Sequence, residues 1–241
     1  MKRTYCVLLS LLLVAVLALT GCGNAGKGAE TKPNTTTESE GTNHATTEKT
    51  DAESAGLGKV EGKVYTNTYV GLGCKLDDNW VIASAEELQN VPDEITEILN
   101  GTELGELANN IPQIMDMQAQ SLDTGASVNV LYTKMSALEK KAYEQMNEEE
   151  IVDTILKNKD IIIESYANTG IEVQSMDKAA MDFLGEKHTV CKTVGTAQGV
   201  EIYLVQVLDY KLPGQYGVTV TFCAQSEEEI ANIMSCFYKV D

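Results

Sequence analysis

The sequence has little positive charge. Its 241 residues include 18 lysine and arginine residues against 36 aspartate and glutamate residues, which gives a net charge of −18. Nucleic-acid binding depends mainly on lysine and arginine at phosphates, and electrostatic attachment to anionic lipid depends on the same residues. Both of these protein classes are therefore disfavoured.

Arginine is almost absent, because Arg3 is the only one in the chain. Planar, bidentate recognition of carboxylate or phosphate groups usually uses arginine. A general bias toward lysine is enough to explain the low number of arginines. Whatever its origin, the lack of arginine removes the usual means of binding such groups. A site for a nucleotide or a sugar phosphate is disfavoured.

Histidine is scarce and motifs of catalysis are missing. His44 and His188 are the only histidines, and only His188 lies within residues 59–241, which are predicted below to fold. A multi-histidine metal site within one chain is therefore excluded. The sequence contains no H-E-x-x-H, no C-x-x-C and no nucleophile elbow. Gly62-Lys63 and Gly71-Leu72-Gly73 lack the flanking residues of phosphate-binding and dinucleotide-binding loops. We therefore predict no cofactor, no metal site and no enzymatic activity.

No apolar run is long enough for a comfortable transmembrane helix. The run over 7–20 has 14 residues and follows Lys2 and Arg3, whereas a bilayer span needs about 20 residues. This pattern is typical of a signal peptide. It ends in Leu19-Thr20-Gly21-Cys22, which resembles a bacterial lipobox. The resemblance implies cleavage before Cys22 and a diacylglycerol on its sulfur.

A lipid on Cys22 would determine where the protein resides. Each buried CH₂ contributes about 0.8 kcal/mol, so two or three acyl chains anchor a protein stably. We therefore expect residues 1–21 to be removed and the mature protein to sit on the outer face of the cytoplasmic membrane of a Gram-positive type bacterium. The alternatives are an ordinary secretory peptide and an uncleaved anchor with a chance cysteine.

Residues 22–58 are predicted to be a lipidated cysteine followed by a flexible tether. The segment consists mostly of Thr, Ser, Gly, Asn, Glu and Lys, has no aromatic residue, and has Leu57 as its only large apolar residue. Such a composition cannot bury enough surface to offset the entropy of ordering. A flexible chain of this length spans roughly 30–36 Å, which would hold the folded part off the membrane.

Residues 59–241 are predicted to form a single α+β domain, an antiparallel β-sheet flanked by helices. Alternating apolar residues over 69–76 indicate a half-buried strand. Ser84 with Glu87 indicates a capping box that begins a helix, and the helical pattern continues to about Ser121.

The remaining elements follow from caps and from strand-like runs separated by turns. Asn147 with Glu150 and Ser226 with Glu229 are capping signals. The predicted helices lie over 136–146, 147–166 and from 226 onwards, and the predicted strands lie over 127–135, 171–176, 187–196, 200–212 and 216–224.

Several stretches of this domain resemble a family of Gram-positive bacterial lipoproteins with a PsbP-like α/β sandwich. They are the stretch from Tyr65-Thr66-Asn67 through Trp80, Ser84-Ala85-Glu86-Glu87-Leu88, Ser127-Val128-Asn129-Val130, and the closing meander into Ser235-Cys236-Phe237. The resemblance is a pattern of strands and turns over most of 64–241, without a diagnostic motif. PsbP-like proteins include an extrinsic photosystem subunit and a nuclear Ran-binding protein, so the resemblance implies docking to partners. It supplies no catalytic residue.

The domain contains four cysteines, Cys74, Cys191, Cys223 and Cys236. In an exported protein an even number invites disulfides, with three possible connectivities. If the last strands form a meander, however, the strands of Cys191 and Cys223 flank a third strand and are too far apart to bond. We favour buried free thiols that pack as small apolar side chains.

Acidic residues cluster at two predicted helix starts, Glu148-Glu149-Glu150 and Glu227-Glu228-Glu229. Carboxylates interact favourably with a helix N-terminus, which is sufficient to explain both clusters. As a functional hypothesis we take Glu148, Glu149 and Glu150 as a candidate docking face, whose replacement would leave folding nearly intact. Met115 and Met117 are placed in a helical stretch, as core residues.

The leading hypothesis is a membrane-anchored, extracytoplasmic, non-enzymatic binding or assembly module. The domain carries 13 lysines against 30 acids, so its preferred protein partner would be basic or cationic. The alternatives are an extracytoplasmic hydrolase that uses carboxylates, and a small-molecule carrier with a pocket between helices and sheet.

Overall fold

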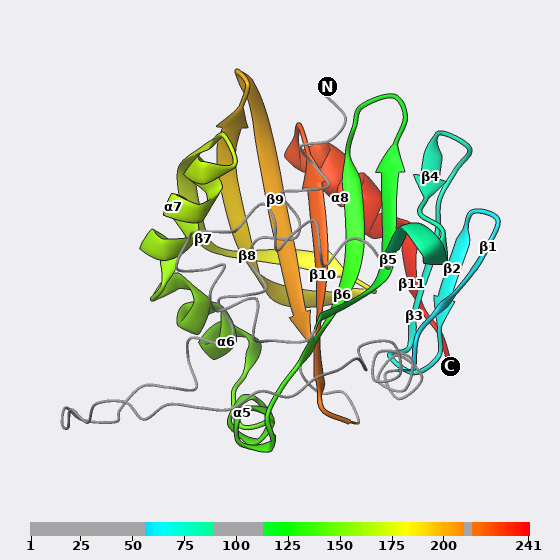
Figure 1. The fold of residues 1–241 in the computed structure, drawn as a ribbon, viewed down its shortest axis with the longest axis horizontal. Coiled ribbons are helices and arrows are strands. Elements are labelled where there is room, and N and C mark those ends of the chain that lie inside the picture. The colour runs from blue at the N-terminus through cyan, green and yellow to red at the C-terminus, as the bar shows by residue number, and fades with distance from the viewer. Residues whose placement is uncertain (1–55, 89–112, 210–213) are drawn as a thin grey trace, which may run out of the picture.

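The computed structural model describes residues 56–88, 113–209 and 214–241. These residues form two antiparallel sheets (Figure 1). The four-stranded sheet has the order β1-β2-β3-β11, with bounds Lys59–Glu61, Val64–Asn67, Leu72–Lys75 and Phe237–Lys239. The seven-stranded sheet has the order β4-β5-β6-β10-β9-β8-β7, with bounds Trp80–Ile82, Gln113–Ser121, Ser127–Lys134, Tyr216–Ala224, Val200–Asp209, Glu186–Ala197 and Ile171–Phe183.

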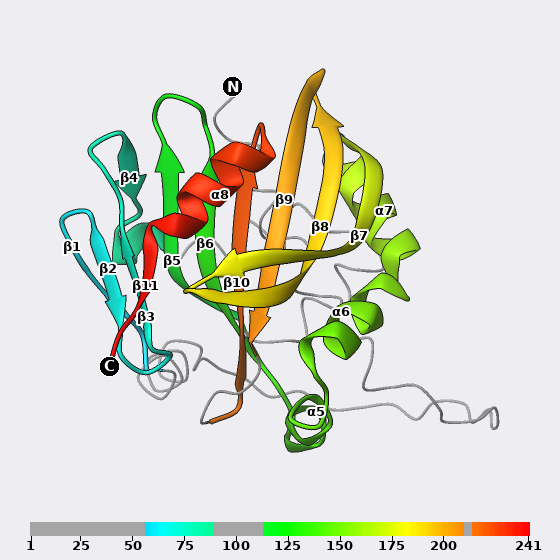
Figure 2. The ribbon, with the colours of Figure 1, turned by 180° about the vertical axis from the view of Figure 1, so that it is seen from behind.

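The helices lie on both sides of the seven-stranded sheet (Figures 1 and 2). Helices α5, α6 and α7 cover one side, and α8 lies on the other side with the four-stranded sheet; their bounds are Ala137–Tyr143, Glu148–Leu156, Lys159–Asn168 and Glu227–Ser235. Each side has its own apolar core. Ile155, Ile162 and Tyr166 are fully buried on the first side, and Tyr65, Phe222 and Ile230 on the second. The predicted α+β class is confirmed.

The predicted helix starts are confirmed by their hydrogen bonds. The Asn147 side chain accepts from the Glu150 amide, and the Glu150 carboxylate accepts from the Asn147 amide. Ser84 and Glu87 exchange the same pair of bonds. The helix predicted over 147–166 is instead two helices: α6 ends at Leu156 and α7 begins at Lys159.

The helix predicted to run to Ser121 is wrong in its last part. Residues Gln113–Ser121 are strand β5, and residues 89–112 lie outside the described ones. Met115 and Met117 are both buried, but on opposite sides of the sheet. The reason is a β-bulge: Met115 faces Leu131 and Met117 faces Val130, which leaves Asp116 as the extra residue.

The last strands form the expected meander, and β7 is longer than predicted. It continues to Phe183 and turns into β8 through Leu184 and Gly185. Both turn residues have positive φ, 53° and 79°, as a two-residue type I′ turn requires. The β7–β8 hairpin bends across the side of the sheet that carries α8 (Figure 2).

The predicted signal peptide, Cys22 and nearly all of the tether lie outside the described residues. Within the described ranges no helix is both long and apolar enough to cross a membrane.

Candidate functional site

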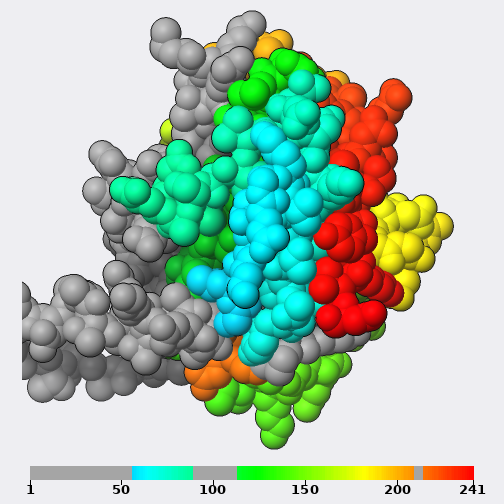
Figure 3. Space-filling view, turned by 90° about the vertical axis from the view of Figure 1, so that its right-hand side faces the viewer, coloured from blue at the N-terminus to red at the C-terminus, as the bar shows by residue number. Residues whose placement is uncertain are grey.

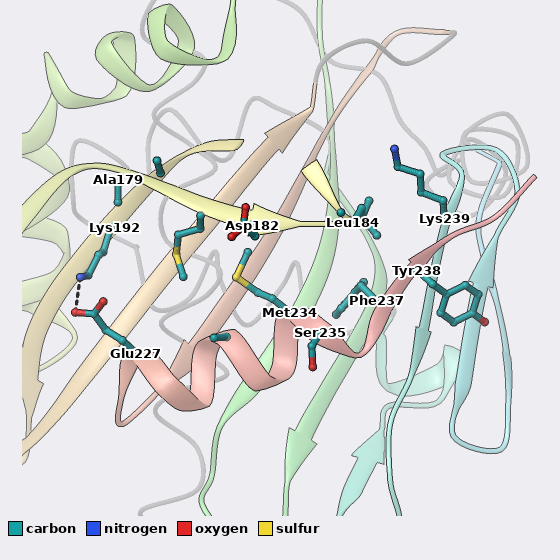
Figure 4. A pocket seen from close by; sticks show the side chains of 14 residues that line it. Ala179, Asp182, Leu184, Lys192, Glu227, Met234, Ser235, Phe237, Tyr238 and Lys239 are labelled. Atoms are coloured by element: carbon teal, nitrogen blue, oxygen red, sulfur yellow. Dashed lines mark hydrogen bonds and ion pairs between the residues drawn. The ribbon is translucent and has the colours of Figure 1, made fainter. Parts of the chain in front are cut away.

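A surface groove lies between the end of the β7–β8 hairpin and helix α8, with β11 at one end (Figure 4). Its volume is about 850 Å³, which is within the range of protein ligand sites. Figure 3 shows β11 beside the tip of the hairpin, at the edge of the four-stranded sheet. The groove therefore brings together β7 and β11, which are each a terminal strand of their sheet.

One wall of the groove is a stripe of α8 and the other is β7. Glu227, Ala231, Met234 and Ser235 recur at helical spacing and line the groove together. The residues of β7 that line it are consecutive, Ala179 to Asp182. Consecutive residues of a strand point to opposite faces, so the groove meets the edge of β7 and its backbone.

The floor of the groove is apolar and is backed by packed aromatic rings. Phe237 and Leu184 line it, and the Phe237 ring packs on Phe183 and Phe222 with centroid distances of 5.5 Å each. Phe183 and Phe222 are themselves 5.6 Å apart in an edge-to-face arrangement, which is favourable for aromatic pairs.

Ion pairs lie at both ends of the groove. At one end Lys192 Nζ is 2.6 Å from a Glu227 carboxylate oxygen, and at the other Lys239 Nζ is 2.5 Å from a Glu186 oxygen. Asp182, near the end of β7, also lines the groove (Figure 4). It makes no ion pair with any described residue, although Lys187 is its neighbour across the hairpin.

A second polar cluster is buried where the two sheets meet. The bulge residue Asp116 is 5% exposed. Its carboxylate accepts hydrogen bonds from the Tyr65 hydroxyl at 2.5 Å, from Asn67 Nδ2 at 2.7 Å and from the Gly58 amide at 2.7 Å. Asn67 Nδ2 also lies 2.8 Å from the Tyr132 hydroxyl.

Burial dominates the electrostatics of this cluster. Loss of hydration raises the pKa of Asp116 above its usual value, and the hydrogen-bond donors around the carboxylate oppose that shift. Burial, together with the neighbouring Asp116, also raises the pKa values of Tyr65 and Tyr132. The cluster fastens the four-stranded sheet to the seven-stranded sheet and is closed to solvent.

A third set of polar side chains lies in the interior of the seven-stranded sheet. The side chains of Asn129, Thr133, Thr193 and Gln206 each have a buried atom that makes no hydrogen bond in the described part of the chain. Buried groups of this kind commonly bind ordered water. Of the polar sets described, the groove is the one that solvent can reach.

The predicted docking face, Glu148, Glu149 and Glu150, lies in the first turn of α6. The Glu148 carboxylate lies 2.7 Å from His188 Nδ1 and accepts a hydrogen bond from the Thr189 amide at 2.8 Å. Glu149 pairs with Lys178 at 2.8 Å, and Glu150 belongs to the capping box.

Because each of these carboxylates has a partner within the domain, the expectation that their joint replacement leaves folding nearly intact is revised. We expect loss of Glu148 to destabilise the packing of α6 on β8. The hypothesis that the three residues dock a partner stays a prediction.

The four domain cysteines are free thiols in the structure, with Cys236 the least buried. Cys191 and Cys223 lie on β8 and β10, which flank β9, as the meander predicts. Burial raises the pKa of Cys191 to about 12 and raises those of Cys74 and Cys236 as well. Buried thiols of high pKa are poor nucleophiles. Among the described residues, no three His, Cys, Asp or Glu side chains are grouped to hold a metal ion.

Sequence reasoning missed both the groove and the Asp116 cluster. The groove joins residues from 179–192 and 227–239, and no local pattern links these segments. Asp116 lay within a stretch interpreted as helix, which concealed the bulge. The one signal in the sequence for the Asp116 cluster was a single acidic residue within an otherwise largely apolar stretch.

No protein-family model matches the chain, and no curated protein matches it. One solved structure that is similar is the solution structure of cyanobacterial PsbP (CyanoP) from Synechocystis sp. PCC 6803. The TM-score is 0.41 and the identity 9%, over 76% of this chain and 98% of that chain. The sequence was predicted to resemble PsbP-like proteins. At 9% identity this similarity concerns the fold and not the function.

Proposed function

We propose that this protein is a lipid-anchored, extracytoplasmic binding module that docks a protein partner in the groove between β7 and α8. The groove itself carries the proposal. It combines an apolar floor, a strand edge and the Asp182 carboxylate, which makes no ion pair with a described residue, in one accessible place.

The N-terminal sequence supports the cellular part of the proposal. A lipobox-like Leu19-Thr20-Gly21-Cys22 follows an apolar run and precedes a long polar segment. A lipid on Cys22 and a flexible tether would present the groove to partners at some distance from the membrane.

Charge supports a basic partner. The domain has 30 acids against 13 lysines, and a field of this sign attracts cationic surfaces and accelerates their association. Both groove lysines are neutralised by Glu227 and Glu186, whereas Asp182 is available to a positive group.

The test is in-cell cross-linking of the lipidated protein, followed by purification and mass spectrometry, with two matched variants. Ala231 and Asn232 are adjacent, exposed residues of α8, and only Ala231 lines the groove. Ala231→Arg fills the groove with a positive side chain, while Asn232→Arg places the same charge outside it. Arginine is a good helix former at both positions.

We expect one partner at near-stoichiometric yield, lost in Ala231→Arg and retained in Asn232→Arg. Equal recovery with both variants would exclude the groove as the docking site. Absence of any partner above background would favour the small-molecule carrier, which thermal stabilisation by ligands would then reveal.

The anchor is tested separately with Cys22→Ser. Metabolic labelling with a radioactive fatty acid should mark the wild-type protein and not this variant, which should leave the membrane fraction. Cys6→Ser is the control, since Cys6 lies in the peptide that cleavage would remove. Labelling that survives in Cys22→Ser would overturn the lipid anchor.

A further inference from the structure

We propose that the partner enters the groove as an extended segment and adds to the free edge of β7 as an extra antiparallel or parallel strand. This inference rests on the proposed function, because it specifies how the same groove is occupied. It follows from the hydrogen-bonding pattern of the β7–β8 hairpin.

β7 is the terminal strand of the seven-stranded sheet. Among the described residues β8 is its only strand partner, and its outer edge makes no backbone hydrogen bond with any of them. Unpaired N–H and C=O groups of an edge strand are a template for another strand.

The turn determines which of these groups face outward. Phe183 and Glu186 flank the two-residue turn, so they form a hydrogen-bonded pair, and such pairs alternate along an antiparallel ladder. Met181 and Ala179 are therefore bonded to β8. The N–H and C=O groups of Lys178, Ala180 and Asp182 then point away from β8, and Ala180 and Asp182 line the groove.

Edge strands are commonly protected by lysine, proline or a bulge. The bulge of β7 lies between Val173 and Ser175, away from the groove. The one lysine of β7 itself, Lys178, is held by Glu149 and Asp153 of α6 at 2.8 and 2.9 Å. Within the described part of the chain, none of these devices therefore protects the edge where it lines the groove.

The opposite boundary also suits a strand. β11 is the terminal strand of the four-stranded sheet, and Phe237 to Lys239 line the same groove. An added segment would lie between the terminal strands of the two sheets, against α8. Ala179, Ala180 and Ala231 have small side chains, which leave room for its backbone.

The lining determines the chemistry of the segment. Met181, Leu184, Met234 and Phe237 favour an apolar side chain on the face toward the floor. Asp182 makes no ion pair among the described residues and favours a lysine or arginine nearby. Since strand residues alternate between faces, the preferred occupant alternates apolar and basic or neutral polar residues.

The test uses backbone amide exchange, read residue by residue, on the detergent-solubilised mature chain. The probe is a seven-residue peptide that alternates valine with lysine and threonine, at 1 mM. With a dissociation constant near 0.1 mM, binding should slow exchange about tenfold at the Lys178, Ala180 and Asp182 amides. Ala179 and Met181 should change little, because their amides already bond to β8.

Two control peptides isolate backbone pairing and charge. A peptide N-methylated at alternate residues cannot pair as a strand and should give no protection. A peptide with glutamate in place of lysine should bind more weakly. Absence of the alternating protection pattern with the lysine peptide, or equal protection by the N-methylated peptide, would overturn the strand addition.

Two variants separate this inference from the proposed function. Ala180→Pro removes an outward N–H, and proline is tolerated where the N–H of an edge strand faces solvent. Ala180→Val keeps the N–H and is the control. Strand addition is supported if Ala180→Pro loses both the peptide protection and the cross-linked partner while Ala180→Val retains both. A partner that is lost in Ala231→Arg but retained in Ala180→Pro would leave the groove as docking site and overturn the strand mode.

Discussion

The hydroxyl of Tyr65 donates a 2.5 Å hydrogen bond to the Asp116 carboxylate, across 51 residues of sequence. Tyr65 belongs to the four-stranded sheet and Asp116 to the seven-stranded sheet. The Gly58 amide bonds to the other carboxylate oxygen. Asp116 therefore fixes the point at which the N-terminal segment joins the domain.

Replacement of Asp116 should destabilise the domain strongly. Asp116→Ala leaves the Tyr65, Asn67 and Gly58 donors without their acceptor, and we expect a loss of about 3–5 kcal/mol in the free energy of unfolding. Urea denaturation measures this loss. Asp116→Asn keeps the shape and should lose less, about 1–3 kcal/mol. The control Asp123→Ala, at an exposed turn, should change stability by less than about 0.5 kcal/mol. Equal stability of the alanine variants would contradict the role assigned to Asp116.

Stability should depend on pH through Asp116. Because burial raises its pKa in the folded state, the folded protein retains the proton to higher pH than the unfolded chain does. The contribution of this proton is fully present below the unfolded pKa, about 3.9, and is lost as pH rises through the folded pKa. The stability difference between wild type and Asp116→Asn, from urea titrations at several pH values, should therefore shrink as pH rises. A difference that grows with pH would mean that the donors outweigh burial.

Glu148 and Glu149 should differ in their effect on stability. Glu148 bonds to the His188 ring and to the Thr189 amide, and its side chain is 33% exposed. Glu148→Ala should lower the free energy of unfolding by about 1–2 kcal/mol, because it removes hydrogen bonds made by a charged group. Glu149→Ala, which breaks an exposed ion pair, should change the thermal midpoint little. If the two variants melt together, the Glu148 contacts do not stabilise α6 on β8.

The thiols should react in the order of their exposure. Cys236 is partly exposed, whereas Cys74, Cys191 and Cys223 are buried, and burial raises the pKa of Cys191 to about 12. Iodoacetamide on the native protein should label Cys236 first, and the other three only after unfolding. Peptide mass spectrometry reads the sites. Early labelling of Cys191 would show that β8 opens readily.

Local signals in the sequence were sufficient for much of the fold. The capping pairs at Ser84, Asn147 and Ser226 mark helix starts that the structure confirms, because a cap bonds to residues only two or three positions away. The strands β6, β8, β9 and β10 were also recognised, because each is a run of strand-forming residues bounded by turn residues.

The β5 strand shows where local reasoning fails. Ile114, Met115 and Met117 fit a helix pattern as well as a strand pattern, and the bulge at Asp116 disturbs the alternation that would have decided between them. Pairing with β6 and burial of Asp116 by Tyr65 and Asn67 select the strand. These partners are distant in sequence, so no local window contains them.

By itself the sequence determined the acidic charge, the α+β class, the helix caps and the lipobox-like leader, all of which depend on composition or on neighbouring residues. Tertiary structure alone decided that Glu148 pairs with His188, that Asp116 joins two sheets, and that β7 leaves an open edge beside α8. Each of these depends on contacts between segments that are far apart in the chain. Long-range packing sets those contacts, because side chains far apart in the chain compete for the same buried surface.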